Sequence, residues 1–270
     1  MTSSTLNIGI MGASGRMGRM LLQAADNNPK TKLAGAFVRS VSSLIGVDAG
    51  EFIGTGKNGV ALSTLDVSGI DVLIDFSLPE ALDDVLAQCV AQKKPLIMGV
   101  TGLNAEQEAK LTAASQEIAI VYAGNFSTGV NLSLNLLATT AKVLGLEADV
   151  EIIEHHHKHK IDAPSGTALM MAKSVADARK QSLKTALVHG RHGAAKRTAG
   201  DIGMHAVRGG EIVGEHTVEF IMDGEIIEIT HKAQSRTTFA AGAVRAAVWA
   251  ADKPAGLYDM QDVLGLKNAS

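Results

Sequence analysis

A glycine-rich turn near the N-terminus constrains the fold of this chain more than any other feature. The strand-like segment 6–11 runs directly into Gly12-Ala-Ser-Gly15-Arg-Met-Gly18, and a helical pattern follows over 16–27. Glycines at this spacing let the backbone turn tightly and approach a pyrophosphate, which binds the unpaired N–H groups of the helix N-terminus. A tight turn without a ligand would use the same residues. Its place between the first strand and the first helix favours dinucleotide binding.

Strand-like and helical patterns alternate through the first half of the chain. Beyond the first helix, they predict strands at 32–38, 72–76, 96–100 and 118–121, and helices at 79–91 and 105–116. Such alternation indicates a parallel sheet that helices cover on both faces. The predicted fold class is therefore α/β, beginning with a Rossmann-like dinucleotide-binding domain.

The second half of the chain has a different pattern. It predicts a helix at 132–144, strands at 150–154, 204–207, 216–222 and 225–231, and a last helix at 239–251. Asp223-Gly224, between the last two strands, is a strong hairpin signal. Residues 190–203 have no periodicity and are predicted to form a long loop.

Composition limits the classes of partner and the compartment. The formal net charge is −3 and only 3% of residues are aromatic, so we expect no nucleic-acid partner. No apolar run approaches the roughly 20 residues that span a bilayer, and the N-terminus lacks the pattern of a signal peptide. The single cysteine, Cys89, excludes an internal disulfide and suggests a reducing compartment. We therefore expect a cytoplasmic protein without a membrane partner.

The region after the second strand bears on the choice of cofactor. Dinucleotide-binding folds often carry an acidic residue there for the ribose 2′-hydroxyl, but from Ala36 onward the first acidic residue is Asp48. Arg39, alone or together with Arg16, would instead pair with a 2′-phosphate, which favours NADPH; a solvated surface arginine is the alternative. The turns at 99–102 and 124–129 each end a strand, so they would either complete the cofactor site or serve as ordinary loops.

Residues 154–167, Glu-His-His-His-Lys-His-Lys-Ile-Asp-Ala-Pro-Ser-Gly-Thr, contain four of the nine histidines of the chain. A metal site is one interpretation, with Glu154 and Asp162 as the only acidic candidates. Lys158 and Lys160 disfavour it, because ammonium groups repel a bound cation. A polar loop with solvated histidines is the second. If the strand continued, alternate side chains would face opposite ways, so all four histidines could not converge on one ligand.

A site for an anionic substrate that undergoes proton transfer is the third interpretation, and the one we favour. Lysine supplies a mobile cation and proton donor, and histidine titrates near neutrality. Pro164-Ser165-Gly166-Thr167 would open a helix that runs to about Arg179. Its hydroxyls and free N–H groups would form a carboxylate cradle. Basic side chains opposite such a cradle suit a small dicarboxylic acid.

Residues 151–168 closely resemble the signature of the dihydrodipicolinate reductase family, which acts in the diaminopimelate route to lysine. The turns at 12–18 and 99–102, the segment 123–127 and the tail from His231 resemble that family too, so the resemblance covers essentially the whole chain. It implies a dinucleotide-binding domain of residues 1–127 and 238–270. Between them it implies an α+β substrate-binding and tetramerisation domain, residues 128–237, with a mixed or antiparallel sheet.

The resemblance also implies a reaction and a set of site residues. The reaction is hydride transfer from NADPH or NADH to 4-hydroxy-tetrahydrodipicolinate, with loss of water to give tetrahydrodipicolinate, and the assembly is a homotetramer. His156 is the implied acid/base and Lys160 the implied proton donor, with no metal. The implied substrate-binding residues are His157, Ser165, Gly166 and Thr167. The implied cofactor-binding residues are Gly12, Ala13, Ser14, Gly15, Arg16, Met17, Arg39, Gly99, Val100, Thr101, Ala123, Gly124, Asn125 and Phe126.

Two positions depart from the family pattern. Val38 stands where the family can have an acidic residue, which argues against a strong preference for NADH. His155 stands where a small residue is common, and nothing in the sequence explains it.

Two other functions remain open from sequence. A semialdehyde dehydrogenase shares the dinucleotide fold but needs a thiol nucleophile, whereas Cys89 lies in a helical pattern typical of the core. A nucleotide-sensing protein without turnover would keep the glycine turn but would have no use for the histidine and lysine residues of 154–167.

Overall fold

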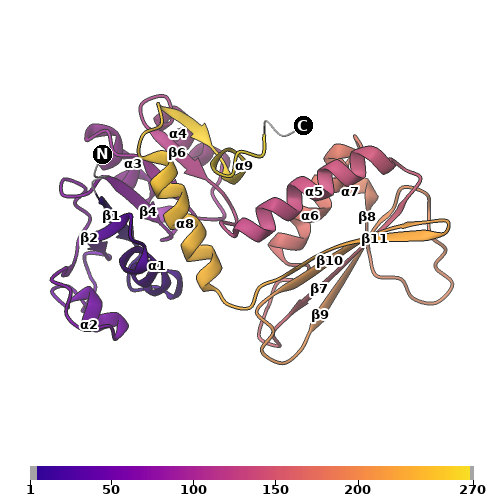
Figure 1. The fold of residues 1–270 in the computed structure, drawn as a ribbon, viewed down its shortest axis with the longest axis horizontal. Coiled ribbons are helices and arrows are strands. Elements are labelled where there is room, and N and C mark those ends of the chain that lie inside the picture. Colours follow the sequence, from indigo (N-terminus) through magenta and orange to yellow (C-terminus); the bar gives the residue numbers. More distant parts are fainter. Residues whose placement is uncertain (1–4, 268–270) are drawn as a thin grey trace. The chain divides into compact units, whose positions relative to one another are not determined.

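The computed structural model describes residues 5–267, and the chain divides into two compact units. The first unit contains the chain up to Thr128 and returns from Thr237 onward, whereas residues 129–236 form the second. The first unit is built on a seven-stranded sheet in the order β12-β6-β5-β4-β1-β2-β3, and all of its strand pairs are parallel. Figure 1 labels β1, β2, β4 and β6 of this sheet.

The elements of the first unit follow the predicted alternation closely. Its strands are β1 (Leu6–Met11), β2 (Thr31–Phe37), β3 (Leu62–Ser63), β4 (Val72–Asp75), β5 (Leu96–Met98), β6 (Ala119–Tyr122) and β12 (Gly256–Tyr258). Its helices are α1 (Arg16–Asn27), α2 (Ala49–Ile53), α3 (Leu82–Ala91) after the 3-10 turn η1 (Pro79–Ala81), α4 (Ala105–Ala114), α8 (Thr237–Ala250) and α9 (Met260–Val263).

Helices cover both faces of this sheet. On one face, buried side chains of α1, α8 and α9 pack with Ile8 and Ile10 of β1. On the other, side chains of α3 and α4 pack with Leu73 and Leu96. Each fully buried leucine or isoleucine stabilises the fold by about 1.5–3 kcal/mol. The predicted parallel sheet with helices on both faces is confirmed.

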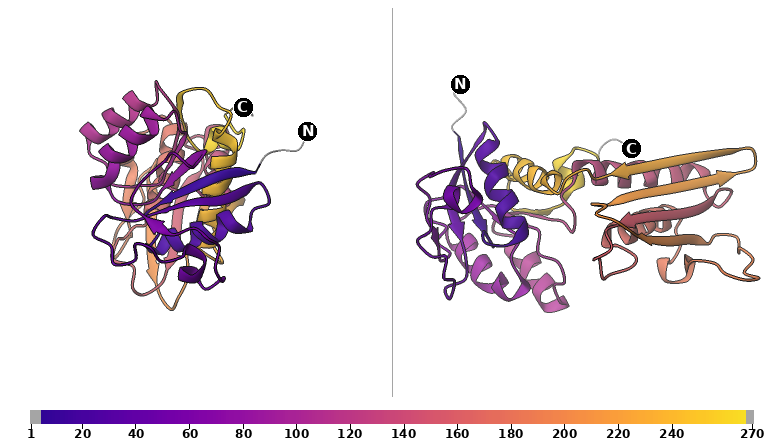
Figure 2. Two further views of the ribbon diagram at one scale, coloured as in Figure 1. Left: turned by 90° about the vertical axis from the view of Figure 1, so that its left-hand side faces the viewer. Right: turned by 90° about the horizontal axis from the view of Figure 1, so that it is seen from below.

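The second unit is a five-stranded sheet in the order β11-β10-β7-β9-β8. Its strands are β7 (Asp149–His156), β8 (Leu187–His189), β9 (Ile202–Arg208), β10 (Glu215–Met222) and β11 (Glu225–Lys232), and its helices are α5 (Thr128–Leu144), α6 (Gly166–Ala178) and α7 (Leu183–Ala186). The β7–β9 and β9–β8 pairs are parallel, whereas β7–β10 and β10–β11 are antiparallel. The sheet is therefore mixed. Helices α5 and α6 lie along one of its faces (Figure 2).

The central strand β7 has two chemically distinct faces. Val150, Ile152, Glu154 and His156 alternate as its buried residues, and the two apolar ones belong to the core formed with α5 and α6. The residues between them, including Glu151, are only partly buried and point to the opposite face. Two carboxylates three residues apart thus lie in different surroundings.

The main differences from the sequence-based expectations concern short elements. Patterns did not predict α2, β3, α7, β8, β12 or α9, each of five residues or fewer, because so short a segment shows no clear period. The predicted loop 190–203 is wrong at its end, since β9 begins at Ile202 and pairs with both β7 and β8. Within residues 5–267, no helix is long and apolar enough to cross a membrane.

Candidate active site

The glycine turn joins β1 to α1 and depends on glycine for its shape. Gly12 has a φ of 78°, and a Cβ there would lie 3.1 Å from the Cα of Ser77. A Cβ on Gly18 would lie 2.2 Å from the carbonyl oxygen of Gly12. Gly15 is the N-cap of α1 and makes no side-chain hydrogen bond to the helix. The amides of the first helical turn lack intrahelical partners, so they can bind a ligand. This cradle fits a pyrophosphate.

Two further turns lie at the carboxyl ends of neighbouring strands of the same sheet. Residues 99–101 follow β5 and residues 123–126 follow β6. The Gly99 amide donates to the carbonyl of Asp75 at 2.8 Å, and the Phe76 and Phe126 ring centroids are 5.3 Å apart. A Cβ on Gly99 would lie 2.4 Å from the Phe76 ring. Phe76, which the sequence patterns did not single out, thus packs against both turns.

The remaining cofactor candidates differ in exposure. Ala13 is buried, whereas Ser14 and Arg16 are exposed at the start of α1. Arg39 is exposed just beyond the end of β2. An exposed guanidinium beside the carboxyl end of a parallel strand can bind a phosphate group of a ligand at that end.

In the second unit, His156 ends β7 beside a buried carboxylate. Its Nδ1 lies 2.6 Å from Oε2 of Glu154, which has no exposed surface. Burial lowers the pKa of His156, and the nearby cations Lys160 and Arg208 lower it too, while Glu154 raises it; the net pKa lies below the ordinary value. His156 is therefore mainly neutral at neutral pH.

Glu154 connects this histidine to two other segments. Arg208, at the end of β9, donates from Nη1 to Oε2 and from Nη2 to Oε1, both at 2.7 Å. The backbone amide of Ser165 donates to Oε1 at 3.0 Å. Burial raises the pKa of Glu154, but the hydrogen bonds from Arg208, His156 and Ser165 lower it by more than burial raises it. The net pKa of Glu154 is therefore below its usual value. Glu154 is an ionised, fully buried hub.

A second histidine, His216 on β10, completes the cluster. Its Nε2 lies 2.9 Å from Oγ of Ser165, and its ring meets the His156 ring edge to face at 5.1 Å. Burial, and then the charge of His156, lower the pKa of His216 to about 4. Ser165 also caps α6, because its Oγ accepts from the amide of Ala168 at 3.1 Å. Gly166 and Thr167 are the first residues of that helix.

The other histidines and lysines of 154–167 have different surroundings. Nζ of Lys160 lies 2.8 Å from Oδ1 of Asp162, and its side chain is 20% exposed. Nε2 of His157 lies 3.4 Å from Nη2 of Arg236. Lys158 and His159 are exposed and lie near Glu211. As the alternation argument predicted, the four histidines do not converge on one point.

Both halves of the chain match models of a single family. Residues 6–126 match "Dihydrodipicolinate reductase, N-terminus" and residues 129–264 match "Dihydrodipicolinate reductase, C-terminus". The chain belongs to the dihydrodipicolinate reductase family. It is thus an NAD(P)H-dependent oxidoreductase of the diaminopimelate route to lysine, and the resemblance found in the sequence is confirmed.

Individual relatives cover nearly the whole chain of this family member. The 4-hydroxy-tetrahydrodipicolinate reductase of Psychrobacter arcticus is 57% identical over 267 residues, which cover 97% of this chain and 96% of the relative. The enzyme of the same name from Neisseria gonorrhoeae is 52% identical, with 97% and 98% covered.

Solved structures show the same fold. Dipicolinate-bound dihydrodipicolinate reductase from Paenisporosarcina sp. TG-14 superposes with a TM-score of 0.76 at 22% identity, covering 96% of this chain and 98% of the other. A putative myo-inositol dehydrogenase from Sinorhizobium meliloti superposes with a TM-score of 0.61 at 13% identity, covering 97% and 94%. At these identities the likeness concerns the fold alone, and the predicted Rossmann-like unit with a second mixed-sheet unit is confirmed.

Three residues of the reductase cluster were missed by sequence reasoning. Arg208 lay one residue beyond the predicted strand 204–207 and His216 lay in a predicted strand, both without any local signal, and Glu154 was considered only as a metal ligand. The sheet register brings them together, because β7 pairs His156 with Arg208 and Glu154 with His216. Such pairing is invisible in a single sequence.

Neither a metal site nor a thiol nucleophile is supported in this reductase. Over residues 5–267, no three histidine, cysteine or acidic side chains are grouped as a metal ion requires. Cys89 is fully buried in α3, and burial raises the pKa of its thiol to about 12. A thiol that stays protonated at neutral pH cannot act as the nucleophile of a semialdehyde dehydrogenase.

Proposed function

We propose that this chain reduces 4-hydroxy-tetrahydrodipicolinate with hydride from NADPH or NADH, releasing water and giving tetrahydrodipicolinate. The match of both family models over residues 6–126 and 129–264 carries the proposal. The printed name of the 57% identical relative states the same activity for that protein. A nucleotide sensor without turnover would not need the buried ionised cluster around His156.

The cofactor is held by the carboxyl-end turns of the parallel sheet. The pyrophosphate is held by N–H groups of residues 12–17 other than those of Gly12 and Ala13, which donate to Phe37, and of Gly15, which donates to Gly12. Residues 99–101 and 123–126 line the site beside them. When bound, the nicotinamide supplies the hydride. The Phe76 ring packs against Gly99 and Phe126, so it would hold the two turns in place around the cofactor.

The substrate is a small dicarboxylate held by basic side chains and the start of α6. His157, with Arg236 beside it, and the first residues of α6, Gly166 and Thr167, bind its carboxylates. The amide and hydroxyl of Ser165 are already engaged by Glu154, Ala168 and His216, so Ser165 contributes by fixing the beginning of the helix. The solved relative with bound dipicolinate supports this ligand class.

Proton transfer is assigned to the lysine and histidine of residues 154–167. Lys160 donates a proton to the ring nitrogen of the substrate as negative charge develops there. His156 shares that proton through Nε2, because its Nδ1 is taken up by Glu154. Asp162 holds the ammonium group of Lys160 in place until substrate binds.

The activity is tested with the purified protein and substrate made by condensing pyruvate with aspartate semialdehyde. The near-ultraviolet absorbance of NADPH should fall only when both precursors and the condensing enzyme are present. A preparation that leaves NADPH unoxidised, beside a related reductase that works in the same assay, would contradict the proposal.

Arg39 favours NADPH by pairing with its 2′-phosphate. Arg39→Ala should lower kcat/KM for NADPH by about tenfold, the equivalent of 1.4 kcal/mol, and leave that for NADH nearly unchanged. Steady-state kinetics with both cofactors measure the ratio. An equal loss with both cofactors would show that Arg39 does not read the 2′ position.

We also propose that the chain assembles as a homotetramer in the cytoplasm. Within the second unit, α5 and α6 pack on one face of the sheet, and Ile226 of β11, which points to the other face, remains exposed. An exposed apolar side chain on an uncovered sheet face suits contact with other subunits. A light-scattering mass of four chains supports the tetramer, and a mass of one or two chains rules it out.

A further inference from the structure

Strand β7 carries two buried or half-buried glutamates, and only one of them touches the proposed proton-transfer residues. We infer that Glu154 and Arg208 are positioning residues for the reduction, which together hold His156 with its proton on Nδ1 and its Nε2 open to the substrate. The inference rests on the proposed function, because only the proposed proton transfer requires this tautomer of His156.

The geometry around His156 sets the tautomer. An ionised carboxylate only accepts hydrogen bonds, so the 2.6 Å contact with Oε2 of Glu154 requires a hydrogen on Nδ1. Burial lowers the pKa of His156, so the second nitrogen carries no proton at neutral pH. Gly214 leaves room on that side, since a Cβ there would lie 3.0 Å from Nε2. His156 thus presents a lone pair, and Lys160 is the residue that brings the proton.

Arg208 makes the buried carboxylate possible. Glu154 has no exposed surface, and an unpaired charge at such a position is strongly destabilising. The guanidinium meets both carboxylate oxygens at 2.7 Å, a planar two-bond contact that lysine cannot reproduce. The carboxylate therefore stays ionised and keeps its acceptor oriented toward His156.

The same ion pair joins three parts of residues 154–167. Through Glu154 it holds His156 at the end of β7 and the amide of Ser165 at the start of α6. Through Nη2, Arg208 also donates to the carbonyl oxygen of Asp162 at 2.8 Å, and the Asp162 side chain holds Lys160. The pair thus fixes the proton acceptor, the proton donor and the anion cradle relative to one another.

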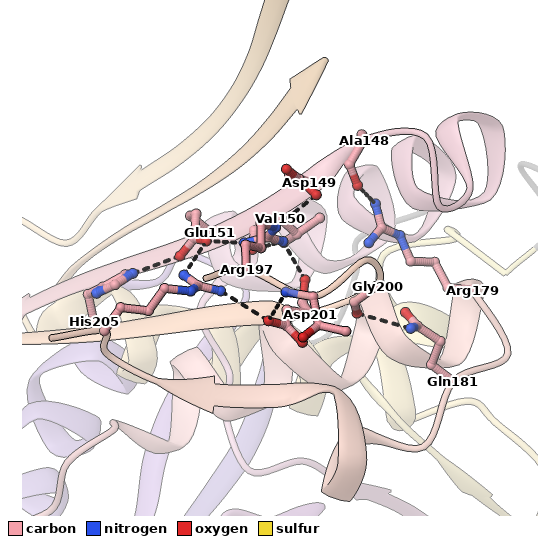
Figure 3. A network of polar contacts seen from close by, with 12 residues as sticks. Ala148, Asp149, Val150, Glu151, Arg179, Gln181, Arg197, Gly200, Asp201 and His205 are labelled. Carbon is pink, nitrogen blue, oxygen red and sulfur yellow. Dashed lines mark hydrogen bonds and ion pairs between the residues drawn. The ribbon is translucent and has the colours of Figure 1, made fainter. Parts of the chain in front are cut away.

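Glu151 provides a matched control on the opposite face of the same strand. Its Oε1 accepts from Arg191 at 2.7 Å and from Arg197, and its Oε2 lies 2.7 Å from Nε2 of His205 (Figure 3). The chemistry is the same as at Glu154, a carboxylate held by arginine and histidine. This network ties the segment before β9 to the sheet and contacts none of the proposed site residues.

The first experiment compares Glu154→Gln with Glu151→Gln. The carboxylate of Glu154 accepts through two oxygens, whereas the amide of Gln has only one oxygen that accepts. When its oxygen faces Arg208 and Ser165, its NH₂ group faces His156 and donates to Nδ1. The imidazole proton then has to move from Nδ1 to Nε2. We expect kcat to fall about 10–100-fold, the range seen when the partner of an oriented histidine is removed, with the Kd for NADPH unchanged. In Glu151→Gln, kcat should stay within about twofold of wild type. Equal losses in both variants, or no loss in Glu154→Gln, would overturn the inference.

The pH profile separates positioning from folding. The charged groups facing His156 are Glu154, Lys160 and Arg208, with His216 packed against its ring. Removing the carboxylate removes the one group that raises the pKa of His156. The acid limb of kcat/KM should therefore move to lower pH in Glu154→Gln and stay in place in Glu151→Gln. An unmoved limb in Glu154→Gln would reduce Glu154 to a structural role.

Two further measurements test the inference when a variant misfolds or when the NADPH assay shows no activity. Arg208→Lys should retain more turnover than Arg208→Met, because it keeps the charge that the buried carboxylate needs. Imidazole ¹⁵N shifts of His156, assigned by their loss in His156→Gln, should show a protonated Nδ1 and a bare Nε2 in the wild-type protein. This measurement needs no substrate, so it decides the inference even if NADPH oxidation fails. A protonated Nε2 would refute it.

Discussion

We propose that the two functional parts of this reductase work by opposite means, one by binding the cofactor through the backbone and the other by positioning proton-transfer groups through charged side chains. The glycine turn of the first unit uses backbone N–H groups, and its residues Gly12 and Gly18 contribute only the absence of a side chain. The cluster around Glu154 in the second unit uses ionised side chains, each held by another. The first part should therefore respond to added volume and not to pH, whereas the second should respond to charge and to pH.

Removing the proton donor should break the second part alone. We expect Lys160→Ala to lower kcat by about 10²–10⁴-fold, the contribution of a positioned proton donor. The Kd for NADPH should stay nearly unchanged, because the cofactor turns contain none of the residues that Lys160 contacts. Stopped-flow turnover and fluorescence titration of NADPH measure the two quantities. An equal loss of cofactor affinity would show that Lys160 belongs to the first part instead.

The pH dependence of stability should report His216. Its pKa falls from an ordinary value near 6.5 to about 4 on folding, so the unfolded state binds the proton more readily. Stability is therefore fully present above about pH 6.5 and is lost as the pH falls toward 4, by on the order of 3 kcal/mol at about 1.4 kcal/mol per pKa unit. Asparagine at 216 keeps a hydrogen-bonding group but does not titrate.

Urea unfolding at several pH values measures this loss. His216→Asn should have a shallower decline between about pH 6.5 and 4 than wild type, with the rest of the slope due to His156, His231 and carboxylates. Parallel curves for the two proteins would mean that His216 does not stay neutral in the folded state.

The same contrast explains what sequence could predict. The turn at 12–18 and the long elements follow from local patterns, since glycine spacing and periodicity act within a few residues. The roles of His156 and Lys160 were predicted from the resemblance of a local segment, residues 151–168, to the family signature. Arg208 lies 54 residues from Glu154, and only the pairing of β7 with β9 joins them. Register depends on packing of the whole sheet, so no single-sequence pattern carried it.

Added volume tests the first part. A Cβ at position 18 would lie 2.2 Å from the carbonyl oxygen of Gly12, so Gly18→Ala must distort the turn. We expect about 1–3 kcal/mol of lost stability and a weaker Kd for NADPH, with kcat retained when the cofactor is saturating. Gly69→Ala is the control, since a Cβ there meets nothing within 4 Å. A pH-dependent loss of affinity in Gly18→Ala would contradict a purely backbone site.

The smallest effect on turnover is expected at Cys89, which lies in the first unit but belongs neither to the glycine turn nor to the Glu154 cluster. Its thiol is fully buried on α3, and a pKa of about 12 keeps it protonated. Cys89→Ser should keep kcat within about twofold, while the buried hydroxyl costs about 1–3 kcal/mol of stability. Turnover measured well below the melting temperature separates the two effects. Cys89→Ser could instead lose turnover at that temperature while circular dichroism shows an intact fold. This result would restore a thiol mechanism. It would also place the chemistry in the first unit, away from the Glu154 cluster.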